Sequence, residues 1–519
     1  MGLRQSRVFF LVLSVLFLTC GEIVIAEGLR LPAMISDHAV MQADKPIAIW
    51  GWGEAGKKVS VKLGDQVGET VVGDDGKWQL KLGVMKAGGP YRLEVSSAGE
   101  SIWVKDVLIG EVWLCGGQSN MEWRLHESEG GKEAIKNSAD GEMRYFLVTK
   151  RVSRKPVEEV EGEWKVISPE TAGGISGVGY YFGKELREHV GEPVGLVNSN
   201  WGGTRVEAWT SEESLKANVA GQQILKANAS WEALSEAKLE QYTKAIAEYE
   251  VKRINAEPTD RRPWVPLELQ RRHYGSNLYN GMIHGVSQYT MRGAIWYQGE
   301  SNAGRAEQYI ELFPLLIEDW REQWGQDAFA FGFVQLANYY EKQKEPVQAA
   351  TWPELREAQL LTLKRVPDTG MAVITDIGEA KDIHPRNKKD VGIRLSLWAR
   401  ATQYGEKELV YSGPIYADHA IEGDQIRIKF DHVGDGLMAS DGSELRGFAI
   451  AGEDKKFVWA EAVIQGKSVV VSAAGVKKPV SVRYNWANNP VGNLVNKNGL
   501  QASLFRTDDW PRVTRGKWK

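Results

Sequence analysis

The chain has 519 residues, of which 43% are apolar and 25% are charged, and its formal net charge is −4. This is the composition of an ordinary globular protein, long enough for two to four domains with their own cores. A charge so close to neutral gives no reason to expect nucleic acid or an anionic membrane surface as a partner. The sequence leaves the oligomeric state open.

The N-terminal segment has the pattern of a secretory signal peptide. Arg4 and Arg7 precede an apolar run over residues 8–18, which is too short to span a bilayer comfortably. Small residues favour cleavage after Ala26. We therefore expect residues 1–26 to be removed and the mature protein to be secreted or periplasmic. No other stretch of the sequence has the length and apolar character of a membrane span.

The sequence holds two cysteines, Cys20 and Cys115. If Cys20 leaves with the signal peptide, Cys115 is a single thiol and no internal disulfide forms, which a chain with ample core does not need. The alternative is that Cys20 carries a lipid anchor, but Thr19 is a poor residue immediately before a lipoprotein cysteine.

Residues 28–106 predict an N-terminal β domain. Short stretches of β-branched and aromatic residues are separated by Asp and Gly turns, as at residues 74–76, which favours a small β-sandwich. The same pattern returns after Tyr404, so we expect a second β domain over residues 409–519. Within it, the polar and aromatic run at residues 485–490 is typical of a loop, and we expect it to return towards the functional site.

Residues 107–405 alternate between apolar strands and amphipathic helices, which predicts an α/β domain with a doubly wound parallel sheet. We expect strands at residues 107–115, 193–198, 293–297, 329–336 and 371–376, and helices at residues 180–190, 307–324, 354–365 and 388–404.

One segment, residues 211–255, interrupts this alternation. It is rich in Ala, Glu, Lys and Gln and predicts a helical insertion that ends before Pro258 and Pro263. The insertion forms either a lid or a solvated helical hairpin, and its polar composition favours the hairpin.

The first strand of the α/β domain ends in Gly116-Gly117, and Ser119 follows. Paired glycines let the backbone turn sharply and leave the next side chains open. Open α/β sheets bind ligands at the carboxyl ends of their strands. We therefore interpret Ser119 as a nucleophile. The alternative is an ordinary loop hydroxyl or a helix N-cap.

Other strand ends carry residues that a serine nucleophile needs. Gly202 and Gly203 follow the second strand and can present backbone N–H groups to an oxyanion. Gln298 follows the third strand and can donate from its side-chain amide. Beyond the fifth strand, His384 stands two residues after Asp382, so the chain supplies a base and an acid for acyl transfer.

Together the motifs GGQSNMEW, NWGGTRVEAW, WYQGESN and DIHPRNK resemble those of the sialate O-acetylesterase family, within the SGNH hydrolase superfamily. The resemblance covers nearly the whole mature chain. It implies a flavodoxin-like three-layer α/β/α hydrolase domain flanked by β domains. It also implies removal of O-acetyl groups from sugars without metal or cofactor.

By these motifs Ser119 is the nucleophile and His384 the base, and the oxyanion donors are the Ser119 amide, Gly202 or Gly203, and Gln298. The chain departs from the superfamily in two places. The acid usually stands three residues before the histidine, where this chain has Lys381, and Gln298 replaces a frequent asparagine.

The acid behind His384 is therefore open. Asp382 is the first candidate, Asp376 at the end of its strand is the reserve, and a Ser–His dyad is the third option.

Substrate contacts are open as well. Arg205 can bind a substrate carboxylate bidentately or pair with Glu207. Trp201 and Trp123 can stack on sugar rings or pack in the core. The rival functions are an acetylxylan or other polysaccharide acetylesterase and a non-catalytic carbohydrate-binding protein on a hydrolase scaffold.

Overall fold

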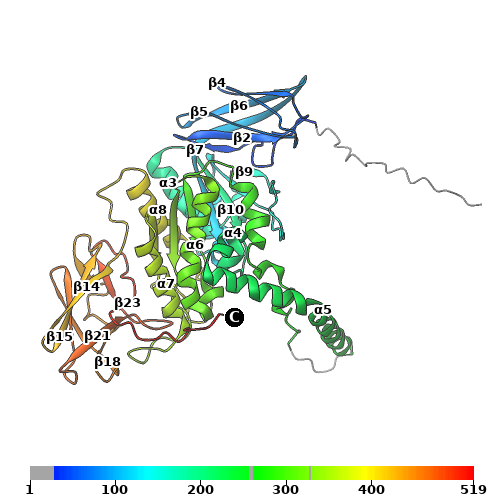
Figure 1. Ribbon diagram of the computed structural model, residues 1–519. Helices are drawn as coiled ribbons and strands as arrows, with labels where there is room; N and C mark the ends of the chain where they lie inside the picture. The colour runs from blue at the N-terminus through cyan, green and yellow to red at the C-terminus, as the bar shows by residue number, and fades with distance from the viewer. Residues whose placement is uncertain (1–27, 256–260, 327–328, 519) are drawn as a thin grey trace, which may run out of the picture.

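The computed structural model describes residues 28–255, 261–326 and 329–518. The predicted signal peptide, residues 1–26, lies outside the described residues. The described chain forms a central α/β body, a β domain near its N-terminus and another β domain towards its C-terminus (Figure 1).

The central sheet confirms the predicted α/β class. Its strand order is β13-β12-β11-β7-β10-β8-β9, in which every neighbouring pair from β13 to β8 is parallel and β9 is antiparallel at the edge. The apolar runs that form β11, β12 and the second half of β7 fit a sheet whose two faces are both covered. The strands are β7 (Glu100–Gly117), β8 (Asp140–Leu147), β9 (Trp164–Ile167), β10 (Val194–Asn200), β11 (Gly293–Tyr297), β12 (Ala330–Gln335) and β13 (Thr369–Val373).

Helices cover both faces of this sheet. On β12, Phe331 and Phe333 contact Phe313 of one helix, whereas a Cβ on Gly332 would lie 2.4 Å from Trp398 of another. Alternate residues of a strand point to opposite faces, so these two helices lie on opposite sides. The helices of the body are α1 (Ser119–Glu122), α2 (Gly131–Lys136), α3 (Gly177–Val190), α6 (Ala306–Trp324), α7 (Thr351–Arg365) and α8 (Lys389–Gln403).

The sequence did not predict β8 and β9. Arg144 interrupts the apolar run of β8, yet its side chain is only 3% exposed and binds the carboxylate of Asp106 at 2.9 Å. A charged residue can be buried in a strand when it has a charged partner. Because that partner comes from another segment, the local sequence does not show that the residue is buried.

The N-terminal β domain is not separated from the α/β body by a linker. Strand β7 runs from Glu100 to Gly117, so the expected start of the α/β domain at residue 107 falls inside a single strand. Buried residues of the two parts form one continuous core. The N-terminal strands are β1 (Val40–Gln42), β2 (Pro46–Trp52), β3 (Lys58–Leu63), β4 (Gln66–Val71), β5 (Lys77–Val84) and β6 (Gly88–Ser97).

The C-terminal β domain has its own core between two four-stranded sheets, β14-β15-β20-β19 and β18-β17-β21-β23. Its loop at residues 485–490 returns to the α/β body, where Arg356 of α7 donates to the carbonyls of Ala487 and Asn488. The strands are β14 (Ile415–Glu422), β15 (Gln425–Asp431), β16 (Leu437–Ala439), β17 (Phe448–Gly452), β18 (Phe457–Trp459), β19 (Glu461–Gln465), β20 (Ser468–Ser472), β21 (Pro479–Tyr484), β22 (Leu494–Asn496) and β23 (Phe505–Arg506).

The predicted helical insertion is present, but the prediction that it forms a hairpin is wrong. After the short helix α4 (Glu212–Ala217), α5 (Val219–Ile254) is one helix of 36 residues that projects from the body (Figure 1). The chain from 219 to 254 has no proline, and its single glycine stands near the start, so nothing breaks the helix. Only residues of its first turns are buried, namely Ala220, Gly221 and Ile224.

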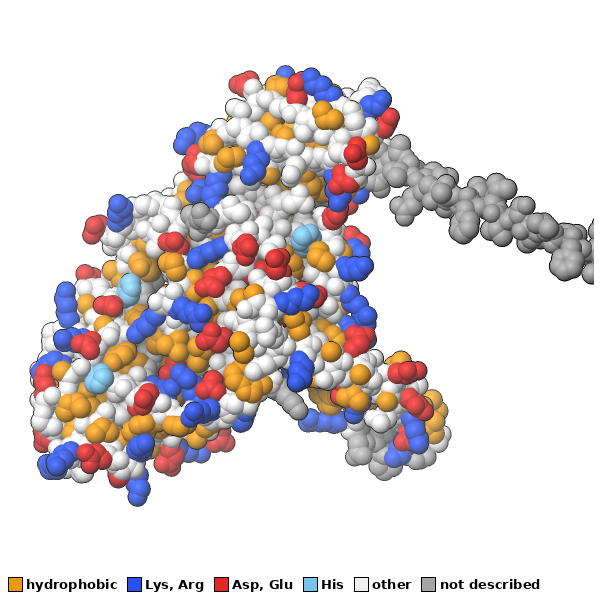
Figure 2. Space-filling model, in the orientation of Figure 1, with side chains coloured by type: hydrophobic (Ala, Val, Ile, Leu, Met, Phe, Trp, Pro, Cys, Tyr) orange, Lys and Arg blue, Asp and Glu red, His pale blue; other side chains and the backbone are white. Residues whose placement is uncertain are grey.

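Positive and negative side chains are interspersed over the face drawn in Figure 2, in keeping with the small net charge. None of the helices in the described ranges combines the length and the apolar character that crossing a membrane requires.

Candidate active site

Ser119 lies at the carboxyl end of β7, in the middle of the sheet. Gly117 makes the turn before it, with φ at +139° and its position for a Cβ only 2.2 Å from the carbonyl oxygen of Tyr297. Any side chain there would collide with β11, so glycine is required. The turn places Ser119 as the first residue of α1, where the residue is partly exposed.

His384 and Asp382 meet Ser119 from the segment between β13 and α8. The Nε2 atom of His384 is 2.9 Å from the Ser119 hydroxyl. The Nδ1 atom of His384 is 3.3 Å from Oδ1 of Asp382, and that oxygen also accepts the backbone N–H of His384 at 2.9 Å. This is the order nucleophile, base and acid that acyl transfer to a serine requires. The structure therefore brings together the three residues that the sequence analysis favoured.

Asp376 does not lie behind His384, so the reserve acid is wrong. Its two carboxylate oxygens accept bidentate hydrogen bonds from Arg394 of α8, at 2.7 and 2.6 Å. The sequence could not exclude Asp376, because the arginine that binds it stands on the following helix.

Two of the backbone N–H groups expected to bind the oxyanion, those of Ser119 and Gly203, are unoccupied within the described residues. The Ser119 amide opens a helix and has no intrahelical acceptor, and neither it nor the Gly203 amide has an acceptor among the described residues. Gly202 lies against Ser119, but its N–H donates to Glu122 at 2.6 Å, and Glu122 also binds Lys150. Of the two expected glycine donors, only Gly203 is therefore unoccupied.

Gln298 is not an oxyanion donor in this structure, contrary to expectation. Its side chain is fully buried, and its amide donates to the carbonyl of Thr204 at 3.2 Å and to Asn302 at 2.7 Å. Its oxygen accepts from the Tyr309 hydroxyl at 3.0 Å. Both amide hydrogens are engaged, so Gln298 ties β11 to the loop after β10.

The surroundings of His384 favour a neutral imidazole. Burial lowers the pKa of His384, and the Lys388 ammonium adds to this effect, while Asp382 opposes it. Trp123 stacks on the imidazole with 5.2 Å between ring centroids. Trp123 therefore packs against the histidine, and it is half-buried.

Arg205 is half-buried beside the loop of Gly202 and Gly203. It forms no hydrogen bond with Glu207, the expected alternative partner, whose carboxylate binds Arg305 at 2.6 Å. Burial lowers the pKa of Arg205, and the Glu207 charge opposes this larger effect. Among the described residues, no side chain or carbonyl accepts a hydrogen bond from the Arg205 guanidinium, which lies 5.6 Å from the Trp231 ring of α5.

Trp201, the other expected sugar contact, is half-buried. The Lys150 ammonium lies 5.4 Å from its ring.

A buried polar group that was not predicted from the sequence lies beside the catalytic residues. Asn120 contacts Glu300, Lys388 and the carbonyl of Ile383, all within 3.0 Å. Asn120 and Lys388 stand inside the motifs around Ser119 and His384, so motif position was the signal that could have drawn attention to them.

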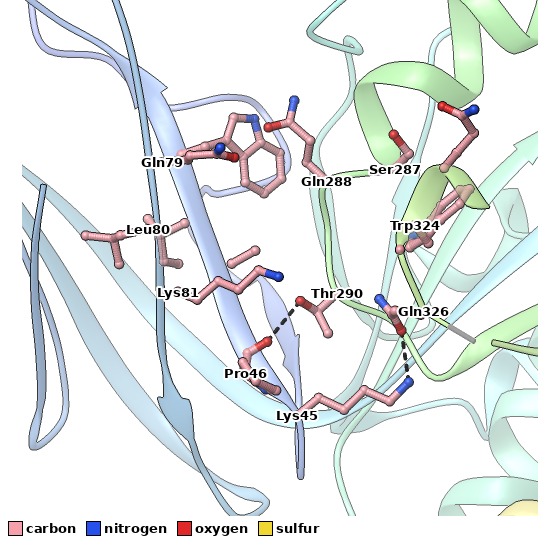
Figure 3. A pocket seen from close by; sticks show the side chains of 15 residues that line it. Lys45, Pro46, Gln79, Leu80, Lys81, Ser287, Gln288, Thr290, Trp324 and Gln326 are labelled. Atoms are coloured by element: carbon pink, nitrogen blue, oxygen red, sulfur yellow. Dashed lines mark hydrogen bonds between the residues drawn. The ribbon is translucent and has the colours of Figure 1, made fainter. Parts of the chain in front are cut away.

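Within the described ranges, no three His, Cys, Asp or Glu side chains gather as a metal site would require. The cavity in Figure 3, about 640 Å³, lies between the N-terminal β domain and the segments before β11 and β12. Lys45 spans it by donating to Gln326 and to the carbonyl of Met291. The cavity is at the amino ends of the strands, away from Ser119 and His384.

Comparison with known proteins decides the family. Residues 109–239 and 262–393 match the family described as carbohydrate esterase, sialic acid-specific acetylesterase. The chain belongs to this family. Its enzymes are carboxylic ester hydrolases that remove acetyl groups from sugars, so the esterase chemistry expected from the motifs is confirmed.

Named relatives agree with this assignment. The chain is 34% identical to mouse sialate O-acetylesterase over 75% of its own length and 76% of the mouse protein. It is 31% identical to the human enzyme over 75% of this chain and 73% of the human protein. A crystal structure of a carbohydrate acetylesterase from Xanthomonas citri superimposes with a TM-score of 0.79 and 38% identity, over 93% of this chain and 100% of that one.

Proposed function

We propose that this protein is a serine esterase that removes O-acetyl groups from sialic acids through an acetyl-enzyme on Ser119. The observation that carries the proposal is the 2.9 Å contact between the Ser119 hydroxyl and Nε2 of His384, in a chain of the sialic acid-specific acetylesterase family. We also propose that the α/β body has the flavodoxin-like fold of SGNH hydrolases. The order β10-β7-β11-β12-β13 supports a flavodoxin-like SGNH hydrolase domain, with β8 and β9 added at one edge.

In the first half of the reaction, His384 accepts the Ser119 proton as the serine oxygen attacks the acetyl carbonyl. The carbonyl oxygen becomes an oxyanion that the backbone N–H groups of Ser119 and Gly203 can bind. His384 then returns the proton to the sugar oxygen, which leaves as an alcohol. Asp382 holds the imidazole with Nε2 towards Ser119 and stabilises the imidazolium.

In the second half, water attacks the acetyl group on Ser119 while His384 takes a proton from that water. His384 then gives this proton to the serine oxygen as the second tetrahedral intermediate collapses, which releases acetate and restores the serine hydroxyl. The two half-reactions, acylation of Ser119 and hydrolysis of the acetyl-enzyme, thus use the same base and the same oxyanion donors, and the chain supplies every group that they need.

Arg205 supports sialic acid over a neutral sugar. A guanidinium without an acceptor in the described structure is available for a carboxylate on the substrate, and sialic acids carry one. We further propose that residues 1–26 direct export and that the mature enzyme acts on O-acetylated glycans in the periplasm or outside the cell.

The test compares acetate release from O-acetylated sialic acid with release from acetylated xylan, at matched acetyl concentration. We expect a higher kcat/KM for the sialic acid. A preference for xylan would overturn the proposed substrate while leaving the serine chemistry intact.

A further inference from the structure

A single buried amide, that of Asn120, joins the two loops that carry the reacting residues. Asn120 follows Ser119 directly, and its amide nitrogen donates at 3.0 Å to the carbonyl of Ile383, which directly precedes His384. The side chain is fully buried, with 0% of its surface exposed. A movement of either loop would therefore break this hydrogen bond in a place that water does not reach.

Two further side chains hold the amide in this orientation. Glu300, which follows β11, accepts from the Asn120 amide nitrogen at 2.6 Å. Lys388, immediately before α8, donates to the Asn120 oxygen at 2.5 Å. Since the nitrogen faces two acceptors and the oxygen faces a donor, the amide cannot be reversed without losing all three contacts.

The Lys388 side chain is buried, and fully buried lysines are rare in proteins. None of its surface is exposed, and its stem fills the space beside Gly177 of α3, where a Cβ would lie 3.2 Å from it. Its ammonium lies 5.6 Å from the ring of Trp123 and 5.5 Å from that of Tyr297. The Trp123 ring is the one that stacks on His384, so the cation lies close behind the base.

We propose that Asn120 and Lys388 are positioning residues that hold Ser119 and His384 at reacting distance. Neither side chain contacts the Ser119 hydroxyl or an atom that changes bonds. The inference rests on the proposed serine chemistry and assigns to these residues the geometry on which that chemistry depends.

The charges around His384 and Lys388 predict that loss of Lys388 changes the pH dependence of activity as well as the rate. The charged groups that act on His384 are Lys388, which lowers its pKa, and Asp382, which raises it. Burial lowers the pKa of Lys388 to about 7, opposed by Glu300, Asp382 and Glu379. At pH 5 to 6 the lysine is therefore charged, and its removal should make His384 easier to protonate.

The experiment measures kcat, KM and the pH profile of p-nitrophenyl acetate hydrolysis for Asn120→Ala, Lys388→Met and Lys388→Arg. Displacement of reacting groups by about 1 Å costs roughly 100-fold in rate, so we expect kcat to fall roughly 10- to 100-fold in Asn120→Ala and Lys388→Met, with little change in KM. Lys388→Met should also move the acid limb of kcat/KM to higher pH, and Lys388→Arg should restore part of kcat.

Lys389→Met is the matched control, because it removes the same charge one residue away on an exposed side chain. We expect its kinetics to be those of the wild type. Circular dichroism establishes that each variant is folded, and if Lys388→Met does not fold, Asn120→Ala and Lys388→Arg carry the test.

Wild-type kcat in folded Asn120→Ala would overturn the positioning role of Asn120, and wild-type kcat with an unmoved acid limb in folded Lys388→Met would overturn that of Lys388. Failure of the serine chemistry itself would appear separately, as an active Ser119→Ala variant.

Discussion

The indole of Trp123 lies nearly parallel to the imidazole of His384, with 5.2 Å between ring centroids and 21° between the ring planes. A stacked ring restricts rotation of the imidazole about its bond to Cβ. It therefore helps keep Nε2 directed at Ser119, in addition to the contact of Nδ1 with Asp382.

We predict that Trp123→Ala lowers kcat for p-nitrophenyl acetate roughly 10- to 100-fold, because the freed imidazole leaves the reacting geometry for part of the time. Trp123→Phe keeps an aromatic face and should retain most of the activity. Steady-state kinetics of both folded variants check this. An unchanged kcat in Trp123→Ala, with a raised KM for acetylated sugars, would instead make Trp123 a sugar platform.

The pH dependence of kcat/KM should show an acid limb below pH 6.5, the ordinary pKa of histidine. His384 must be neutral to accept the serine proton, so activity is lost as the pH falls through its pKa. Burial and Lys388 lower that pKa, and activity should therefore persist to a lower pH than an ordinary histidine allows. A limb centred at or above pH 7 would contradict this assignment.

The two candidate acids are separated by Asp382→Asn and Asp376→Asn. Asp382 contacts His384, so its replacement should lower kcat by roughly 10²- to 10⁴-fold with little effect on stability.

Asp376→Asn should keep its activity and lower the free energy of unfolding by roughly 1–3 kcal/mol, because Arg394 loses a charged partner. Kinetics and urea denaturation of both variants provide the measurement. An inactive Asp376→Asn variant together with an active Asp382→Asn variant would contradict the assignment of Asp382 as the acid.

Arg205→Met tests the proposed carboxylate contact. A charged hydrogen-bonded pair contributes roughly 1.5–3 kcal/mol, so kcat/KM for O-acetylated sialic acid should fall roughly 10- to 150-fold. Hydrolysis of uncharged p-nitrophenyl acetate should fall much less, and the ratio of the two values is the quantity to compare. An equal loss on both substrates would show that Arg205 supports the loop rather than binding the sugar.

Local patterns were enough to predict five of the seven strands in the order β13 to β9, the end of β7 and the approach of His384 to Ser119. Features that depend on distant partners were not predictable. From the sequence, Gln298 was expected to have a free side-chain amide. In the structure this side chain is bonded to Thr204, Asn302 and Tyr309. Long-range pairing also explains why β8 was missed and why Asp376 stayed a candidate acid, since their arginine contacts join segments separated in the chain.

The central claim, an acetyl-enzyme on Ser119, is tested most directly by kcat for p-nitrophenyl acetate in the wild type and in Ser119→Ala. With circular dichroism showing both proteins folded, the substitution should lower kcat by roughly 10³-fold or more, because the nucleophile is removed while the oxyanion donors remain. A folded Ser119→Ala protein that hydrolyses the ester at the wild-type rate would contradict the claim.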